Sequence, residues 1–146
     1  MYKRYLVPVD GSDTSNKALV AALQMARDSG GALHLVHLEN ELATLGMGEV
    51  DPGEIEDLLE IGHSAAQQVI TNARAICASA GVKADSRIVN SMGQRLGDVI
   101  ANEATDWKAD LIVVGSHGRR GIGRVLLGSG AEQIVRAAPV PVLVIR

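Results

Sequence analysis

The chain has 146 residues, a formal net charge of −3 and a sequence pI near 5.8. This acidic balance argues against broad binding to nucleic acids or to anionic membranes. Hydrophobic residues make up 47% of the chain, but there is no Phe, one Trp and two Tyr, so the core must be aliphatic. A chain of this length can bury such a core as one domain covering residues 1–146.

The single cysteine, Cys77, cannot form an internal disulfide and favours a reducing compartment. It lies on the apolar stripe of an expected helix, which predicts a packing role rather than a nucleophile. The first residues lack the apolar centre of a signal peptide, and no apolar run reaches membrane-spanning length. We therefore expect a cytoplasmic protein that does not insert into membranes.

Apolar strand-like runs alternate with segments of helical periodicity along the whole chain. In chain order we expect a strand at 5–9, a helix ending near 29, a strand at 33–38, a polar loop at 39–53, a helix at 54–80, a strand at 83–89, a helix at 96–107, a strand at 111–114, a short helix at 131–137 and a strand at 142–145. Ser12 or Asp13 could cap the first helix. Pro8 suits only the carboxyl end of the first strand, because it cannot donate to a sheet ladder.

This alternation predicts an α/β fold with five parallel strands and right-handed crossover helices on both faces of an open sheet. In such sheets, ligands bind beyond the carboxyl ends of the strands, where the winding direction reverses. If the first strand is central, with strands two and three on one side and four and five on the other, the loops after strands one and four meet in one crevice. Asp10 follows the first strand and Gly115 follows the fourth.

The segment from Gly115 to Ser129 is the most informative part of the chain. It is rich in glycine, which lets backbone N–H groups approach a ligand closely, and it leads into a helix whose amino end attracts anions. Three arginines lie within it: Arg119, Arg120 and Arg124. A phosphate chain is the ligand that this segment suits best. The alternatives are an ordinary loop for the glycines and solvated surface charge for the arginines.

Several side chains around this crevice are candidates for ligand contact. Asp10 could hold ribose hydroxyls or a divalent cation beside a polyphosphate, or could only cap the next helix. Ser129 could offer its hydroxyl and amide to a phosphate while capping the last helix. His117 could contact the ligand or face solvent. His34 and His37 point to opposite faces of their strand, so they are not a metal pair, and one should be buried and hydrogen-bonded.

Familiar catalytic motifs are missing from the sequence. No Walker-type loop is present, because Arg124 rather than Lys follows Gly123. There is no Gly-x-Gly-x-x-Gly after the first strand and no Gly-x-Ser-x-Gly elbow. A phospho-acceptor receiver domain is disfavoured too, since the third strand leads into Asn90 and Ser91 without an acceptor Asp. The sequence favours binding of a nucleotide over its catalytic conversion, and we assign no catalytic residue.

Gly115, Gly118, Gly128 and Ser129 follow a distinctive spacing: Gly, two residues, Gly, nine residues, then Gly-Ser. With the opening Val7-Pro-Val-Asp10-Gly-Ser12 run and the closing run at 139–144, this pattern resembles the ATP-binding branch of the universal stress protein family, over essentially all of the chain. The chain departs from the family pattern at Gly130, where a bulky apolar residue is common.

The resemblance implies a Rossmann-like, adenine nucleotide alpha hydrolase-like sheet in the order 3-2-1-4-5, with ATP across the loops after strands one and four. The nucleotide-binding residues would be Pro8, Val9, Asp10, Leu38, Val114, Gly115, Ser116, His117, Gly118, Arg119, Arg120, Gly128, Ser129 and Gly130. ADP or AMP could replace ATP, and Asp10 could hold Mg²⁺ through the nucleotide.

The resemblance also implies a stress-response or signalling regulator that acts through a protein partner, not identified by the sequence, or through self-association. Homodimers would form through the last strand, Val142 to Ile145. The alternative function is a slow Mg²⁺-dependent ATPase or phosphotransferase at the same site.

Overall fold

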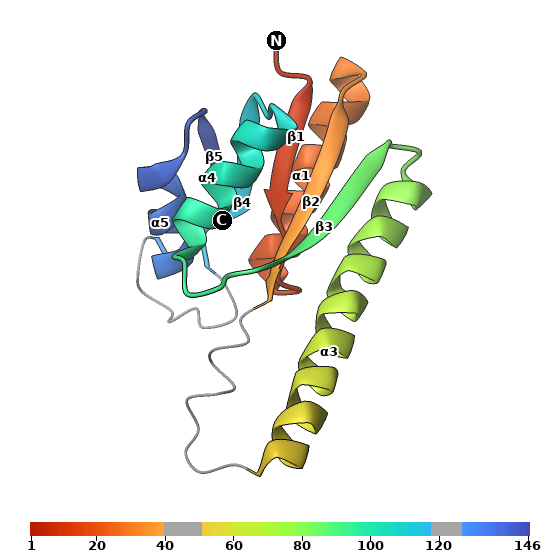
Figure 1. Ribbon diagram of the computed structural model, residues 1–146. Helices are drawn as coiled ribbons and strands as arrows, with labels where there is room; N and C mark the ends of the chain where they lie inside the picture. Colours follow the sequence, from red (N-terminus) through yellow and green to blue (C-terminus); the bar gives the residue numbers. More distant parts are fainter. Residues whose placement is uncertain (40–50, 118–126) are drawn as a thin grey trace.

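The structure, a computed structural model, describes residues 1–39, 51–117 and 127–146 (Figure 1). In chain order its elements are β1 (Arg4–Pro8), α1 (Asp13–Ser29), β2 (Ala32–Glu39), α3 (Pro52–Ser79), β3 (Ala84–Asn90), α4 (Leu96–Trp107), β4 (Leu111–Gly115), α5 (Ser129–Ala137) and β5 (Val142–Ile145). Every expected strand and helix is present, with small shifts at some ends.

The five strands form one sheet in the order β3-β2-β1-β4-β5, and all neighbouring pairs are parallel. The predicted fold class and strand order are therefore confirmed. β1 pairs with β2 along its whole length, but its register with β4 covers only Tyr5 with Leu111 and Leu6 with Ile112. Pro8 is the last residue of β1, as expected, and it has no N–H to extend the ladder. The winding thus reverses between two strands that are paired only near their amino ends.

Two aliphatic cores cover the two faces of the sheet. One core joins α1 and α3 to one face through residues such as Leu19, Leu35 and Ile70. The other joins α4 and α5 to the opposite face through residues such as Ile100, Ile112 and Ile134. This arrangement explains why the central strands are apolar on both faces.

Cys77 belongs to the first of these cores. Its thiol is free and buried, and burial raises its pKa above the ordinary value for cysteine. Less thiolate is then present at neutral pH, and the thiolate is the reactive form. Cys77 is therefore a packing residue, as predicted.

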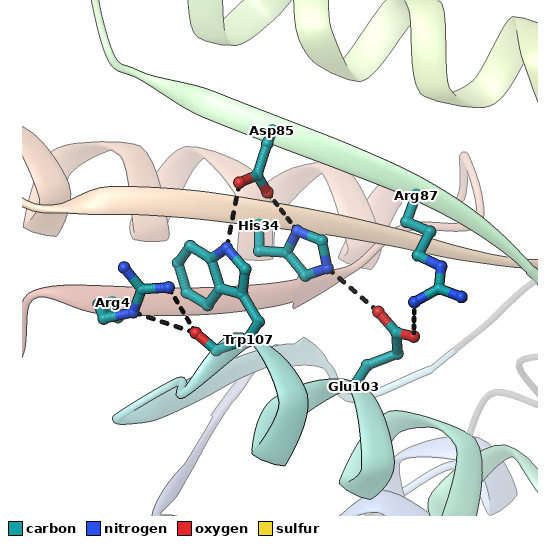
Figure 2. Close-up of polar contacts among 6 residues, drawn as sticks. All are labelled: Arg4, His34, Asp85, Arg87, Glu103 and Trp107. Carbon is teal, nitrogen blue, oxygen red and sulfur yellow. Dashed lines mark hydrogen bonds and ion pairs between the residues drawn. The ribbon is translucent and has the colours of Figure 1, made fainter.

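Both strand histidines are hydrogen-bonded. The Nδ1–H of His37 donates to the backbone carbonyl of Val9 at 2.7 Å, because a carbonyl can only accept. His34 is buried, and its ring lies between two carboxylates (Figure 2). One ring nitrogen contacts Asp85, and the other lies 3.2 Å from Glu103. Because carboxylates accept, the ring donates to both partners only as the imidazolium.

The buried Glu103 carboxylate has a second partner, the Arg87 guanidinium. Arg87 of β3 lies 2.9 Å from its other oxygen, so Glu103 links α4 to both β2 and β3 (Figure 2). Trp107 completes the cluster, stacked on His34 with ring centroids 5.1 Å apart and donating to Asp85 at 3.1 Å. The Arg4 guanidinium covers the indole at 4.0 Å from its centroid. These contacts fix α4 against the β1–β3 side of the sheet.

No helix within the described ranges is long and apolar enough to cross a membrane.

Substitution of Glu103 by Ala should lower the free energy of unfolding by about 2 kcal/mol or more, because it removes one of the two carboxylate partners of the buried His34 and the carboxylate partner of Arg87. The matched control is Glu132→Ala, which removes an exposed ion pair with Arg136 within α5 and should cost less than about 1 kcal/mol. Urea denaturation at neutral pH measures both. Equal losses for the two variants would show that the buried cluster does not stabilise the fold.

Candidate functional site

A pocket of about 390 Å³ opens at the carboxyl ends of β1, β2 and β4, where the winding reverses. Its lining comes from the ends of these strands and from the first turns of three helices. The lining residues are Pro8, Val9, Asp10, Ser15, Val36, His37, Leu38, Leu96, Ile100, Val114, Gly115, His117, Gly130, Ala131 and Ile134.

One part of the lining is apolar and rigidly held. Val36 and Val114 come from strands, and Ile100 and Ile134 come from α4 and α5; all four are buried in one core. Leu96, in the first turn of α4, extends this surface. Such a wall suits the flat, poorly hydrated face of an aromatic ring.

The other part of the lining is polar and lies between β1 and α1. Gly11 adopts a φ of 82°, a left-handed conformation that turns the chain sharply after Asp10. The Asp10 carboxylate then accepts from the Ser12 backbone N–H at 2.8 Å, and the Asp10 N–H donates to the Ser15 hydroxyl at 3.1 Å. Only one Asp10 carboxylate oxygen has a hydrogen-bond partner among the residues that the structure describes. Asp10 is thus held in place with acceptor capacity remaining.

Gly115 brings the loop after β4 against the start of α1. A Cβ added at this position would lie 2.7 Å from the carbonyl carbon of Thr14 and 2.9 Å from the backbone nitrogen of Ser15. Only glycine fits such an approach between two backbones. The Thr14 hydroxyl donates to the carbonyl of His117, which ties the two segments together. Two loops far apart in sequence are thereby brought together at one side of the pocket.

The amino end of α5 closes another side of the pocket. Gly128 is the N-cap of α5, in an extended conformation, and among the residues that the structure describes no side chain caps this helix. Its N–H donates to the carbonyl of Ser116 at 2.6 Å. Ser129 is the first helical residue, so our expectation that Ser129 caps the helix is wrong, because the chain enters the helix one residue earlier. The first N–H groups of α5 have no acceptor within the helix, which is the usual state of a helix start.

Comparison with known proteins bears on this site. The model of the universal stress protein family matches residues 1–146. The chain belongs to the universal stress protein family. Universal stress protein YxiE of Bacillus subtilis (strain 168) is 30% identical over 151 residues, covering 100% of both chains.

Solved structures agree in fold. A universal stress protein from Lactobacillus plantarum has a TM-score of 0.81 at 25% identity, covering 99% of this chain and 98% of that one. A universal stress protein in complex with cAMP has a TM-score of 0.71 at 26% identity, covering 99% of this chain and 97% of that one.

The structure brings many of the expected binding residues of this universal stress protein into the pocket. Those that line it are Pro8, Val9, Asp10, Leu38, Val114, Gly115, His117 and Gly130. Ser116 lies buried beside it, with its hydroxyl 2.8 Å from Nδ1 of His117. Gly128 and Ser129 form the start of α5 without lining the pocket. Gly118, Arg119, Arg120 and Arg124 lie outside the described residues.

Sequence reasoning predicted Val114 but missed the rest of the apolar wall and two polar residues. The missed lining residues are Ser15, Val36, His37, Leu96, Ile100, Ala131 and Ile134. A signal for most of them was available. Helices that follow parallel strands start at the carboxyl edge of the sheet, so the first inward-facing positions of each helix must border a ligand there.

Gly115→Ala should lower the free energy of unfolding by about 1–3 kcal/mol, because the new methyl group meets backbone atoms that cannot move aside. Gly62→Ala provides the control, because a Cβ at this helical position meets nothing within 4 Å. It should instead stabilise the protein by about 0.5–1 kcal/mol. Thermal and urea unfolding compare the two. A neutral Gly115→Ala would contradict the close approach of β4 to α1.

Proposed function

We propose that this universal stress protein binds an adenine nucleotide, with ATP as the physiological ligand, in the pocket between β1, β2 and β4. The observation that carries this proposal is one cavity that combines an aliphatic wall, a held carboxylate and the uncapped amino end of α5. These three features correspond to a purine, a ribose and a phosphate chain. The family member with cAMP bound supports the same ligand class.

Each part of the nucleotide has candidate partners. The purine would pack on the apolar wall near Pro8 and Leu38. The ribose hydroxyls would donate to the remaining acceptor positions of Asp10. The phosphates would accept from backbone N–H groups at the start of α5, from Ser129, and from Gly118, Arg119 and Arg120, which we retain as proposed contacts from the sequence. This assignment places negative charge at a helix amino end, where it is favoured by about 0.3–1 kcal/mol.

The site suits Mg²⁺ only when a bound nucleotide supplies further ligands to the ion. No group of three or more His, Cys, Asp or Glu side chains in the described ranges is placed to hold a metal ion. Asp10 offers a single carboxylate, and Mg²⁺ in nucleotide sites is commonly held by one or two carboxylates together with phosphates. Asp10 is therefore the residue that would hold Mg²⁺, with the phosphates supplying the other charged ligands.

The nucleotide would act by changing how the protein associates. Among the described residues β5 is an edge strand that pairs with β4, and Leu143 on it is exposed, so a second copy could extend the sheet at this edge. A dimer through Val142 to Ile145 and a nucleotide-dependent protein partner are parts of the proposal. The cytoplasm remains the proposed compartment, because the lone cysteine is a free buried thiol.

Protein stripped of ligand should gain several degrees in Tm with excess ATP, since ATP at a hundredfold of its Kd adds about 2.7 kcal/mol to the free energy of unfolding.

Asp10→Ala should weaken ATP binding about tenfold or more, because it removes a charged acceptor for the ribose. Asp13→Ala is the control, since Asp13 is an exposed neighbouring carboxylate outside the pocket. Calorimetry with ATP, ADP, AMP and cAMP measures affinity and preference. No Tm change with any of them would overturn the proposal, and phosphate release that is lost in Asp10→Ala would favour the hydrolytic alternative.

Gly130 and Leu96 form a pair that should shape the same pocket. A Cβ at position 130 would lie 3.0 Å from the Leu96 side chain, so Leu96 occupies space that a side chain at 130 would need. Gly130→Val should push Leu96 towards the nucleotide and weaken ATP binding about tenfold, or about 1.4 kcal/mol. Adding Leu96→Ala should restore most of the affinity. If the changes in ATP affinity caused by the two substitutions simply add in a double-mutant cycle, Gly130 and Leu96 do not act as a pair.

A further inference from the structure

The first half of α3 carries an apolar face that is only partly covered: Leu58 is exposed, and Ile55 and Leu59 are half-buried. Figure 1 shows the amino end of this helix reaching beyond the carboxyl ends of the strands, away from the sheet. From Pro52 to Ala65 no residue is buried, and Leu58 is 38% exposed. The second half of the same helix packs on β2 and β3.

The exposed face is the direct continuation of the buried one. Ala66, Ile70, Ala73 and Cys77 face the sheet and repeat at spacings of three and four residues. Ile55, Leu58, Leu59 and Gly62 continue this spacing towards the amino end. A helix keeps one apolar stripe on one side at such spacings. The apolar stripe of α3 packs on β2 and β3 along its second half and continues beyond these strands along its first half.

Gly62 adds a separate observation. It lies in the middle of α3 on the same stripe, and a Cβ placed there would meet nothing within 4 Å. Gly inside a helix is less favourable than Ala by about 1 kcal/mol. No packing within the described residues requires this glycine. A second backbone that approaches the stripe closely would require it.

The negative charge of the first half of α3 limits which partners could cover this face. Five carboxylates flank or oppose the stripe, and no Lys or Arg occurs between residues 51 and 73: the acidic residues are Asp51, Glu54, Glu56, Asp57 and Glu60. A second copy of α3 would bring like charges together. A second copy is therefore disfavoured, because like charges in close contact repel.

We propose that the exposed half of α3 docks a basic amphipathic helix of a partner protein. Ile55, Leu58 and Leu59 would pack on apolar residues of the partner, with Gly62 allowing close approach. Lys and Arg flanking the partner's apolar stripe would pair with the α3 carboxylates. The face is about 20 Å long, which corresponds to about four turns of a partner helix. The nucleotide pocket supplies none of these residues, so the inference stands or falls independently of the proposed function.

The test uses the full chain and a fluorescent Leu/Lys amphipathic helical peptide of about 18 residues, at about 0.15 M ionic strength. Leu58→Ser should weaken peptide binding about tenfold in fluorescence anisotropy. Ile76→Ser is the matched control, because Ile76 is 37% exposed and lies five turns along the same side of α3, on the half that packs on the sheet. It should leave peptide binding unchanged. Equal affinities for the two variants would overturn the proposal by showing non-specific attraction to an acidic protein.

Gly62→Ala separates docking from helix stability. It should raise helicity and Tm and yet weaken peptide binding, whereas unchanged or tighter binding would contradict the close approach. A Leu/Glu peptide of the same length should not bind, and binding of that peptide would refute the role of the carboxylates.

Two further measurements address the other occupants. A self-association constant in sedimentation equilibrium that falls in Leu58→Ser would assign the face to a second copy and overturn the proposal. Strong hydrogen-exchange protection of residues 52–62 in the isolated protein would show that the chain covers the face itself, with the same consequence.

Discussion

The close approach of Gly115 to the first turn of α1 is the constraint on which the pocket depends. β4 ends against the backbone of Thr14, and a single methyl group there would separate the two segments. The β1–β4 ladder pairs Tyr5 with Leu111 and Leu6 with Ile112, so it does not extend to the carboxyl ends where the two loops begin. The contact at Gly115 brings these loops together, and it places Asp10 and His117 on one cavity.

The two ends of the sheet have different chemistry. At the amino ends, Asp110 accepts from the backbone N–H groups of Lys3 and Arg4 at 2.9 and 3.0 Å, which fixes the start of β1 beside β4. On β1, β2 and β3, the cluster around His34 fixes α4. At the carboxyl ends, hydrogen-bonding groups of the loops and helix starts remain available. Polar groups are thus paired within the protein at the amino ends, whereas at the carboxyl ends one Asp10 carboxylate oxygen has no hydrogen-bond partner among the described residues.

Much of this arrangement could be predicted from the sequence. The alternation of periodicities determined the elements and the parallel sheet, and Pro8 marked the carboxyl end of β1. The strand order needed either an assumption or the family resemblance, because local patterns do not record which strands pair. The pocket's apolar wall was missed for a similar reason: Leu96 and Ile134 look like ordinary core positions until the helix starts are placed in space.

Other features were beyond sequence patterns for physical reasons. Periodicity marks an apolar stripe along α3 but cannot say where the sheet beneath it ends. Gly130 departs from the family pattern, and only coordinates show that Leu96 of another helix fills the space. The position of Ser129 relative to the helix cap depends on the backbone angles of Gly128, which a Gly-Ser pair does not specify. The glycine and arginine segment from 118 to 126 lies outside the described residues, so its predicted contacts stay predictions.

Trp107 is an intrinsic fluorescent probe of one defined region of the protein. It is the single tryptophan of the chain, and it lies at the carboxyl end of α4, between the His34 ring and the Arg4 guanidinium. The opposite end of α4 supplies Leu96 and Ile100 to the pocket. The fluorescence emission of Trp107 therefore reports on its contacts with His34 and Arg4 and not directly on the pocket. A spectral response to a ligand would mean that an element such as α4 or β2 had moved, because both elements contribute residues to the pocket and to the contacts of Trp107.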